Sequence, residues 1–296
     1  MSFYIKEIKV KNALNKLKRK IPYGWDLNIY RGCTHRCQYC YSRYSHQYLG
    51  SNDFYHDLFV KTNIVEVLER ELQSPNWQGE IINLGGVTDS YQPLENRYQL
   101  IPQILKLLIK YKNPIIISTK SDLILRDFHL IDKLSRLTYV NIATSIITTD
   151  ENLVKKIEPG AAGVKKRFQI LKEFRNSNAS RGLHVMPIIP FLTDREENFA
   201  SLFSQAEEVS VDYVLCGTLY LRGLTRPYFL SFLNREFPEL LDKFNLLYKR
   251  GGAGKEYKQM LYQMVNRLRA KYHLSNSYMK PIREKLGKSC LGKNSL

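Results

Sequence analysis

The sequence lacks the features that mark secreted and membrane-embedded chains. No stretch reaches the ~18 uncharged apolar residues that a transmembrane helix needs, and the first ten residues, MSFYIKEIKV, contain no apolar core of a signal peptide. Only five cysteines occur in 296 residues, and three of them lie within eight positions, a pattern unlike a disulfide framework. With 44% apolar residues the chain can still build a sizeable core. We therefore expect a folded, cytoplasmic protein without membrane contact.

The net charge of +17 comes from the two ends of the chain. Residues 1–36 contain nine Lys and Arg against two acids, residues 249–296 contain twelve against two, and the 212 residues between them contain 24 of each sign. Two basic flanks around a neutral body predict a surface that binds DNA or RNA. Solvated tails of a lysine-rich chain are the alternative interpretation.

Short β-branched runs alternate with helical patterns along most of the chain. The runs that we interpret as strands are Leu27–Tyr30, Ile81–Leu84, Ile115–Ile117, Val140–Ser145, Leu183–Ile189 and Tyr213–Leu215. Strand–helix alternation implies parallel strands with right-handed crossovers. Six units predict an α/β fold, a partial (β/α)6 TIM-like barrel, because a closed barrel would need eight.

After about residue 223 only helical patterns follow. We accordingly divide the chain into a basic N-terminal segment (1–24), the partial barrel (25–222) and a basic helical C-terminal extension (223–296). We expect the protein to be a monomer.

Cys33, Cys37 and Cys40 form a C-x3-C-x2-C motif directly after the first predicted strand. In a barrel the loops after the strands lie at the face that carries the active site. An iron–sulfur cluster usually takes four cysteines, so three predict metal ligands for a cluster with one iron left open. A structural zinc site would need a fourth ligand, which His35 or His46 could supply. A non-catalytic zinc- or nucleic-acid-binding module is therefore an alternative.

The cysteine motif resembles the radical S-adenosylmethionine (SAM) signature, with the aromatic Tyr39 before the last cysteine. The resemblance implies a 4Fe–4S cluster whose open iron binds SAM. It implies reductive cleavage of SAM to a 5′-deoxyadenosyl radical that abstracts a substrate hydrogen. It also implies an electron donor such as ferredoxin or flavodoxin, and the partial barrel of that superfamily matches the six predicted units.

Longer segments are similar to the spore photoproduct lyase-like family, often labelled DNA repair photolyase. They are LNIYRGC (27–33), YCYSR (39–43), LGGVTDSYQP (84–93), STKS (118–121) and PIIP (187–190). The similarity runs from about residue 11 to 222 and implies a nucleic-acid substrate in DNA repair or modification. A radical SAM enzyme that acts on a peptide or a small molecule is the alternative.

The residues after the second predicted strand are implied to meet the SAM amino group. Gly85 and Gly86 would allow a close backbone approach, and Thr88 and Asp89 would add a hydroxyl and a carboxylate. An ordinary turn is the alternative, because Gly and Asp are common turn residues.

Later strand ends are implied to bind the rest of SAM. Lys120 would pair with the SAM carboxylate, Ser145 would bind the ribose, and Pro187 would shape the adenine wall beside Tyr39. The alternatives are a solvated lysine and a capping or turn serine.

The substrate radical needs a hydrogen donor. In true spore photoproduct lyases a cysteine near the end of the second strand returns the hydrogen, but this chain has Gly86 and Val87 there. Cys216, which ends the sixth predicted strand, is the available thiol, and we assign it this catalytic role. A small buried apolar residue is the alternative, and Tyr91 and Tyr220 are further candidates.

Overall fold

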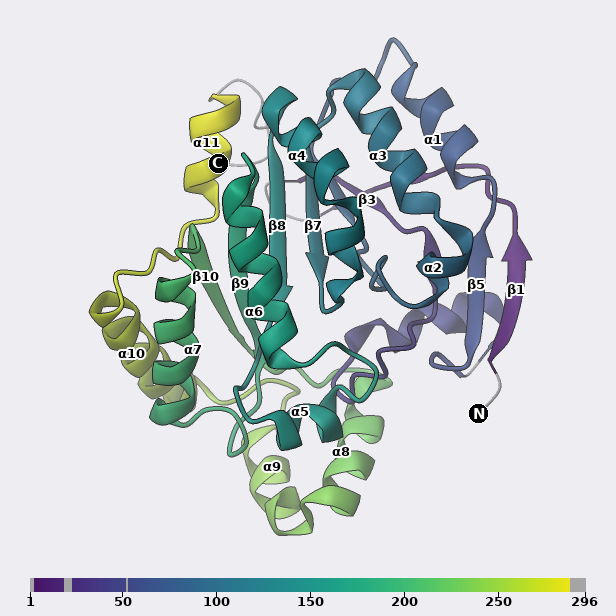
Figure 1. Ribbon diagram of the computed structural model, residues 1–296. Helices are drawn as coiled ribbons and strands as arrows, with labels where there is room; N and C mark the ends of the chain where they lie inside the picture. The colour runs from purple at the N-terminus through teal and green to yellow at the C-terminus, as the bar shows by residue number, and fades with distance from the viewer. Residues whose placement is uncertain (1–2, 19–22, 52, 288–296) are drawn as a thin grey trace.

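The computed structural model describes residues 3–18, 23–51 and 53–287, and its centre is a seven-stranded sheet of order β10-β9-β8-β7-β6-β3-β2 (Figure 1). Six of these strands run parallel: β3 (Trp25–Leu27), β6 (Ile82–Leu84), β7 (Ile115–Thr119), β8 (Val140–Ser145), β9 (Ser180–Ile188) and β10 (Tyr213–Thr218). The short β2 (Leu14–Lys16) pairs antiparallel with β3 at one edge. The predicted α/β fold of six parallel units is confirmed.

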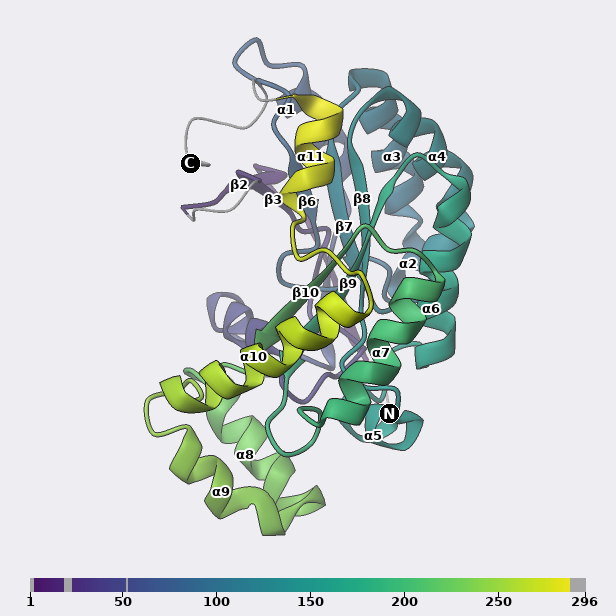
Figure 2. The ribbon, with the colours of Figure 1, turned by 90° about the vertical axis from the view of Figure 1, so that its left-hand side faces the viewer.

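Helices cover one face of the curved sheet, as Figures 1 and 2 show. They are α1 (Ile64–Leu72), α2 (Leu94–Tyr98), α3 (Leu100–Tyr111), α4 (Phe128–Leu137), α6 (Val164–Glu173) and α7 (Glu196–Glu208). The short α5 (Glu151–Ile157) lies below the strand ends in Figure 1. In α3 the buried residues recur at helical spacing, at Leu100, Ile101, Ile104, Leu105 and Leu108. These side chains share one core with Ile115 and Ile117 of β7, and alternate residues of each strand therefore point to the opposite, inner face.

The first predicted strand is divided between two sheets. After Leu27 the chain leaves β6, and β4 (Tyr30–Arg31) pairs antiparallel with β5 (Asp57–Lys61). The strand β1 (Tyr4–Ile8) runs parallel to β5 and completes a three-stranded sheet of order β1-β5-β4. The separation begins at Asn28, whose side-chain oxygen accepts from the Val87 backbone N–H. This small sheet carries the chain into the cysteine loop and was not predicted.

The C-terminal extension contains α8 (Thr225–Glu236), α9 (Leu241–Leu247), α10 (Lys255–Lys271) and α11 (Met279–Leu286). Leu261, Val265 and Leu268 of α10 share a core with α7 and β9. Ile282 of α11 packs with Ile116 of β7 on the inner face of the sheet, where Figure 2 shows α11. The extension thus shares its core with the barrel, and our three-segment division of the chain stays a prediction.

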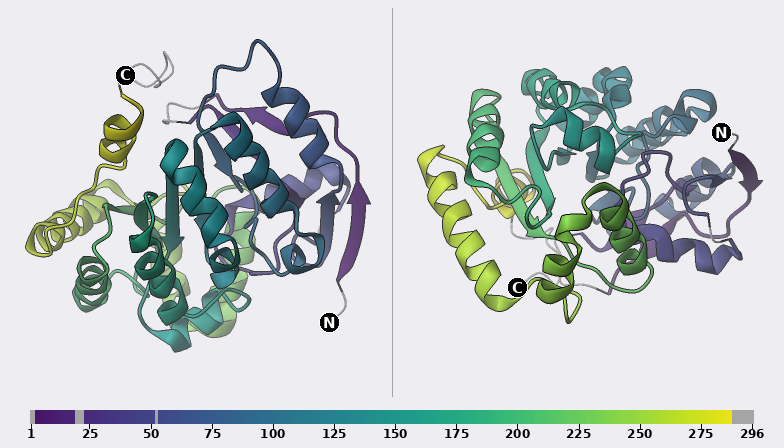
Figure 3. Two further views of the ribbon diagram at one scale, coloured as in Figure 1. Left: turned by 45° about the horizontal axis from the view of Figure 1, so that its top comes forward. Right: turned by 90° about the horizontal axis from the view of Figure 1, so that it is seen from below.

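The carboxyl ends of the parallel strands point toward α8 and α9. The right panel of Figure 3 looks at this end of the molecule, with α8 and α9 beside the 3₁₀-helix η1 (Tyr41–Leu49) that follows the cysteine loop. Thr225 of α8 donates its hydroxyl to the Cys40 carbonyl over 3.3 Å. The extension therefore contacts the cysteine loop directly.

Candidate active site

A cavity of about 660 Å³ lies at the carboxyl ends of the parallel strands. The predicted metal ligands and the predicted SAM-binding residues all line it: Cys33, Cys37, Cys40, Tyr39, Gly85, Gly86, Thr88, Asp89, Lys120, Ser145 and Pro187. Residues from each of the six parallel units thus meet at one place. The volume lies within the ~300–1,000 Å³ typical of ligand pockets.

The cysteine loop is fixed by contacts from two other segments. The Gln92 side chain accepts from the Thr34 backbone N–H at 3.1 Å and donates to the Gly32 carbonyl at 3.0 Å. From the other side, Gly160 donates its backbone N–H to the His35 carbonyl over 3.0 Å. A side chain at Gly160 would put its Cβ 2.1 Å from the Thr34 carbonyl oxygen, so only glycine fits. The shape of the loop is therefore held by protein contacts on both sides.

Cys33 and Cys37 are buried and Cys40 is partly buried, and the nearby cations offset only part of the effect of burial on the pKa values of Cys37 and Cys40. Burial raises the pKa of Cys33 to about 12 and raises the pKa of Cys37 and of Cys40. A thiolate at such a site needs a nearby positive charge, and iron ions supply one. The loop therefore fits an iron–sulfur cluster by its donor set.

A single zinc ion needs ligands that converge on one point. Among the described residues no group of three or more His, Cys, Asp or Glu side chains is arranged to hold one metal ion. Each candidate fourth ligand has one ring nitrogen bonded to an oxygen: His35 Nδ1 lies 3.3 Å from Asp89, and His46 Nε2 lies 2.7 Å from the Asp57 carbonyl oxygen. The second nitrogen of a metal-bound histidine is commonly held in this way. A cluster needs no such convergence, because each thiolate binds a separate iron.

Asp89 is an anchor for the loop and for β7. Its carboxylate accepts from the Thr119 hydroxyl at 2.8 Å, the Lys120 backbone N–H at 2.8 Å and the Tyr91 backbone N–H at 2.9 Å. Burial would raise the pKa of Asp89, but His35 and these hydrogen bonds lower it to about 2. Both oxygens are engaged, so Asp89 is a positioning residue. Asp89 also lines the cavity, and the role of its carboxylate toward the SAM amino group stays a prediction.

The two glycines after β6 are required by the local backbone. Gly85 has φ +84°, and a Cβ there would lie 2.6 Å from the Thr88 carbonyl oxygen. A Cβ on Gly86 would lie 2.2 Å from an Asp26 carboxylate oxygen. Thr88 is buried, and its hydroxyl donates to the Tyr30 carbonyl over 3.4 Å. The local turn therefore requires these residues, all three of which also line the cavity, and their role toward the SAM amino group stays a prediction.

A buried ion pair that the sequence did not reveal lies behind the cavity wall. Glu158 and Arg167 are both fully buried, with Oε2 and Nη1 2.5 Å apart. Glu158 also accepts from the Tyr39 hydroxyl, and Arg167 donates to the Ser145 carbonyl at 2.8 Å. The pair therefore connects the cysteine loop to the end of β8.

Lys120 presents a cation to the cavity. Its ammonium lies 5.8 Å from the centre of the Tyr39 ring. Burial would lower the pKa of Lys120, but the charges of Cys37 and Glu158 raise it overall. Lys120 is therefore charged at neutral pH, as the carboxylate-binding role requires.

His184 lines the inner part of the cavity and was missed by sequence reasoning. Its Nε2 lies 3.2 Å from the Tyr213 hydroxyl. Burial, and secondarily the charge of Lys120, lower the pKa of His184 to about 4. The ring is therefore neutral at pH 7. The only signal in the sequence was its place inside a predicted strand.

Cys216 points away from the cavity, which contradicts the prediction that it faces the chemistry. The next three residues, Gly217, Thr218 and Leu219, line the cavity, whereas Cys216 does not. Cys216 instead packs against the core formed by α7 and α10, and Arg269 of α10 bonds to it. Of the further candidates, Tyr220 lines the cavity mouth and Tyr91 is fully buried behind it.

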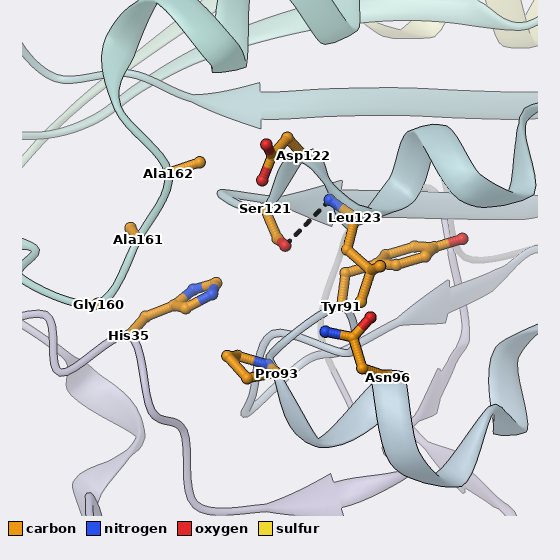
Figure 4. Close-up of a pocket in the computed structure, with 10 residues that line it drawn as sticks. All are labelled: His35, Tyr91, Pro93, Asn96, Ser121, Asp122, Leu123, Gly160, Ala161 and Ala162. Atoms are coloured by element: carbon orange, nitrogen blue, oxygen red, sulfur yellow. Dashed lines mark hydrogen bonds between the residues drawn. The ribbon is translucent and has the colours of Figure 1, made fainter.

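A second pocket of about 410 Å³ lies on the other side of His35. Figure 4 shows its wall, which is formed by His35, Tyr91, Pro93, Asn96, Ser121, Asp122, Leu123 and the Gly160–Ala162 segment. The Ser121 hydroxyl caps η2 (Asp122–Asp127) by accepting from the Leu123 backbone N–H at 3.3 Å. No cysteine lines this pocket, so the chemistry belongs to the larger cavity.

Comparisons with known proteins agree with this geometry. A family model described as the radical SAM superfamily matches residues 27–203. An uncharacterized protein of Mycobacterium tuberculosis is 36% identical over 278 residues, which cover 92% of this chain and 82% of that protein. In the described residues no helix has the length and apolar character to cross a membrane.

Solved structures of spore photoproduct lyase share the fold. One mutant of that enzyme superposes with a TM-score of 0.67 at 15% identity, over 90% of this chain and 79% of the other. A second mutant, solved with bound AdoMet and dinucleoside spore photoproduct, has a TM-score of 0.65 at 15% identity and covers 90% and 78%. At this identity the likeness concerns the fold.

Proposed function

The chain belongs to the radical SAM superfamily, and we propose that it cleaves SAM reductively and abstracts a hydrogen from a nucleic acid. The observation that supports the SAM chemistry is the convergence of Cys33, Cys37, Cys40 and Lys120 on one cavity. When bound, a 4Fe–4S cluster and SAM would supply the 5′-deoxyadenosyl radical, with electrons from a donor such as ferredoxin or flavodoxin. A reducing compartment such as the cytoplasm suits these thiolate ligands.

Each cavity residue has a role in this proposal. The three cysteines hold the cluster, and Lys120 pairs with the SAM carboxylate. Ser145 binds the ribose through its hydroxyl, because its carbonyl is already bonded to Arg167. Pro187 and Tyr39 form the adenine wall, and Tyr39 is held by its hydroxyl on Glu158.

Replacing Lys120 by alanine is expected to weaken SAM binding and leave the cluster intact. The loss of a hydrogen bond to a charged group costs about 1.5–3 kcal/mol, which is about 10- to 150-fold in affinity. Equilibrium dialysis with SAM measures the change, and the visible absorption of the reconstituted protein monitors the cluster. Lys110→Ala is the control, because Lys110 pairs with Glu69 on the outer helices. An unchanged affinity for SAM would contradict this role and favour the alternative interpretation of Lys120 as a solvated lysine.

The surroundings of the cavity mouth support a nucleic acid as the substrate. Tyr23, from the basic N-terminal segment, and Tyr220 both line the cavity. Tyr220 pairs with Gly252 of the basic C-terminal flank, and Arg222 lies 4.6 Å above the Tyr220 ring. Segments from both basic flanks therefore border one opening. Spore photoproduct lyase, which shares the fold, was solved with a dinucleoside in complex.

Neutralising cations at this mouth is expected to flatten the salt dependence of oligonucleotide binding. The variant replaces Arg222, Lys249, Arg250 and Lys258 by glutamine. Each phosphate that a cation neutralises on duplex DNA contributes ~0.9 to the slope of log K against log salt, so four lost contacts would reduce the slope by about 3.6. Fluorescence anisotropy titrations from low to physiological salt measure it.

The matched control for the salt titration replaces four exposed lysines on the outer helices. These are Lys106, Lys133, Lys165 and Lys172. SAM cleavage should be normal in both variants, because none of the eight residues lines the cavity. Equal slopes in the two variants would reject the nucleic-acid interpretation of the charge.

A further inference from the structure

Three exposed tyrosines form a row on η1, the 3₁₀-helix that leaves the cysteine loop. Tyr41, Tyr44 and Tyr48 are exposed by 59%, 43% and 79%. A 3₁₀-helix has three residues per turn, so residues i and i+3 lie above one another, and Tyr41 and Tyr44 share one face. The rings of Tyr44 and Tyr48 meet edge to face with their centroids 6.4 Å apart. We call these three residues the tyrosine row.

The tyrosine row begins at the active-site cavity. Tyr41 follows Cys40 in sequence and lines the cavity. Its hydroxyl donates to the carbonyl of Gly86, in the turn after β6. The row therefore leads from the cavity to the outer surface.

The opposite face of η1 is anchored, so the row is a rigid surface. The Arg43 guanidinium lies between two rings, 4.2 Å from the centre of Tyr55 and 3.9 Å from that of Tyr228 in α8. It also donates to the Tyr55 hydroxyl over 2.7 Å. The His46 ring packs on Phe54 with centroids 4.9 Å apart. Exposed rings on a firmly held element indicate a binding surface.

The chemistry of the row favours a nucleobase over other ligands. Every base has a π-face, so stacking on tyrosine is independent of sequence. The nine residues of η1 contain no Asp or Glu, so no carboxylate on the helix repels a phosphate. An enzyme that acts on a base inside a cavity must also take that base out of the duplex.

We propose that the tyrosine row binds an unpaired stretch of nucleic acid by stacking its bases next to the cavity. The inference rests on the proposed nucleic-acid substrate and adds that the bound strand is single or locally opened. The basic flanks contribute charge to any polyanion. The row selects strands whose base faces are accessible.

The test compares binding of a labelled single-stranded oligonucleotide and of the same sequence as a duplex to the full reconstituted chain. The variant Tyr44→Ala with Tyr48→Ala should bind the single strand about a hundred-fold more weakly, because each lost stack is worth about ten-fold. Duplex binding should change little. Tyr44→Phe with Tyr48→Phe should bind like the unaltered protein, because stacking needs the ring and not the hydroxyl.

Two controls keep the outcome interpretable. Leu137→Ala with Leu246→Ala removes two exposed apolar side chains elsewhere and should leave both affinities unchanged. The cluster absorption shows that each variant is folded. Equal single-strand affinity in the alanine variant would overturn the inference, as would a loss of self-association in that variant, which would assign the row to a protein interface. If the unaltered protein binds neither oligonucleotide, the proposed substrate itself is wrong.

Discussion

Alanine at Cys33, Cys37 or Cys40 is expected to leave the protein without iron–sulfur absorption and unable to form 5′-deoxyadenosine. Each substitution removes one of the three thiolates that would hold the cluster. The unaltered chain, reconstituted anaerobically, should contain about four irons. Iron and sulfide analysis measures the cluster, and chromatography of the products after reduction with dithionite measures SAM cleavage. The expected loss of activity is complete.

Cys216→Ala is the matched control for these variants. Cys216 is a cysteine of the same barrel, but it packs against α7 and α10 and away from the cavity. Its replacement should therefore leave both the iron content and the yield of 5′-deoxyadenosine unchanged. Stoichiometric zinc in the unaltered protein, together with no SAM cleavage, would disprove the assignment of the cysteine loop.

The barrel could be predicted because its strands are buried on both faces. Such strands appear in a sequence as short apolar runs, as at Val140–Ser145, where prediction and structure agree to the residue. The small sheet β1-β5-β4 could not be predicted in the same way. Most residues of β1 are exposed, and its partner β5 lies some fifty residues further along the chain. The pairing of β1 with β5 is therefore visible only in the folded structure.

The residues that line the cavity could be predicted where they lie at the carboxyl end of a parallel strand. Ser145 ends β8 and Lys120 directly follows β7, and the ends of parallel strands meet at one edge. The prediction for Cys216 was wrong because the sequence located β10 but did not show which of its residues line the cavity. The hydrogen bonds of Asp89 could not be predicted, because its partners Thr119 and His35 come from other segments of the chain.

Glu158 and Arg167 left no signal that sequence reasoning could use. Glu158 stands in a Pro-Gly-rich connection, and Arg167 sits on a helix whose neighbours Lys165 and Lys166 are exposed. From such a context the side chains of Glu158 and Arg167 are both expected to be exposed to solvent. The fold places Glu158 against Tyr39, 119 positions away in the chain.

Removing the Arg167 charge is expected to destabilise the protein strongly. Both members of the pair are fully buried, and Arg167 also donates from Nε to the Ala162 carbonyl at 2.6 Å. Arg167→Met would leave the Glu158 carboxylate buried without its cation, a change that costs about 3–5 kcal/mol of unfolding free energy. Urea denaturation of the full chain, followed by circular dichroism at neutral pH, measures this cost. Arg136→Met is the control, because its pair with Asp132 is exposed and is worth at most about 1 kcal/mol.

Two further measurements distinguish the effect of an unpaired buried carboxylate from the effect of lost packing: a second substitution and the pH dependence of stability. Adding Glu158→Gln to Arg167→Met should recover most of the stability, because no buried carboxylate is then left without its ion-pair partner. Burial would raise the pKa of Glu158, but Arg167 and Lys120 lower it below its ordinary 4.5. The stabilising contribution of Glu158 is therefore present above pH 4.5 and is lost as the pH falls through the folded-state pKa. The difference between Arg167→Met and the unaltered protein should shrink on acidification, whereas a cost that arises from packing alone would persist at every pH and in the double variant.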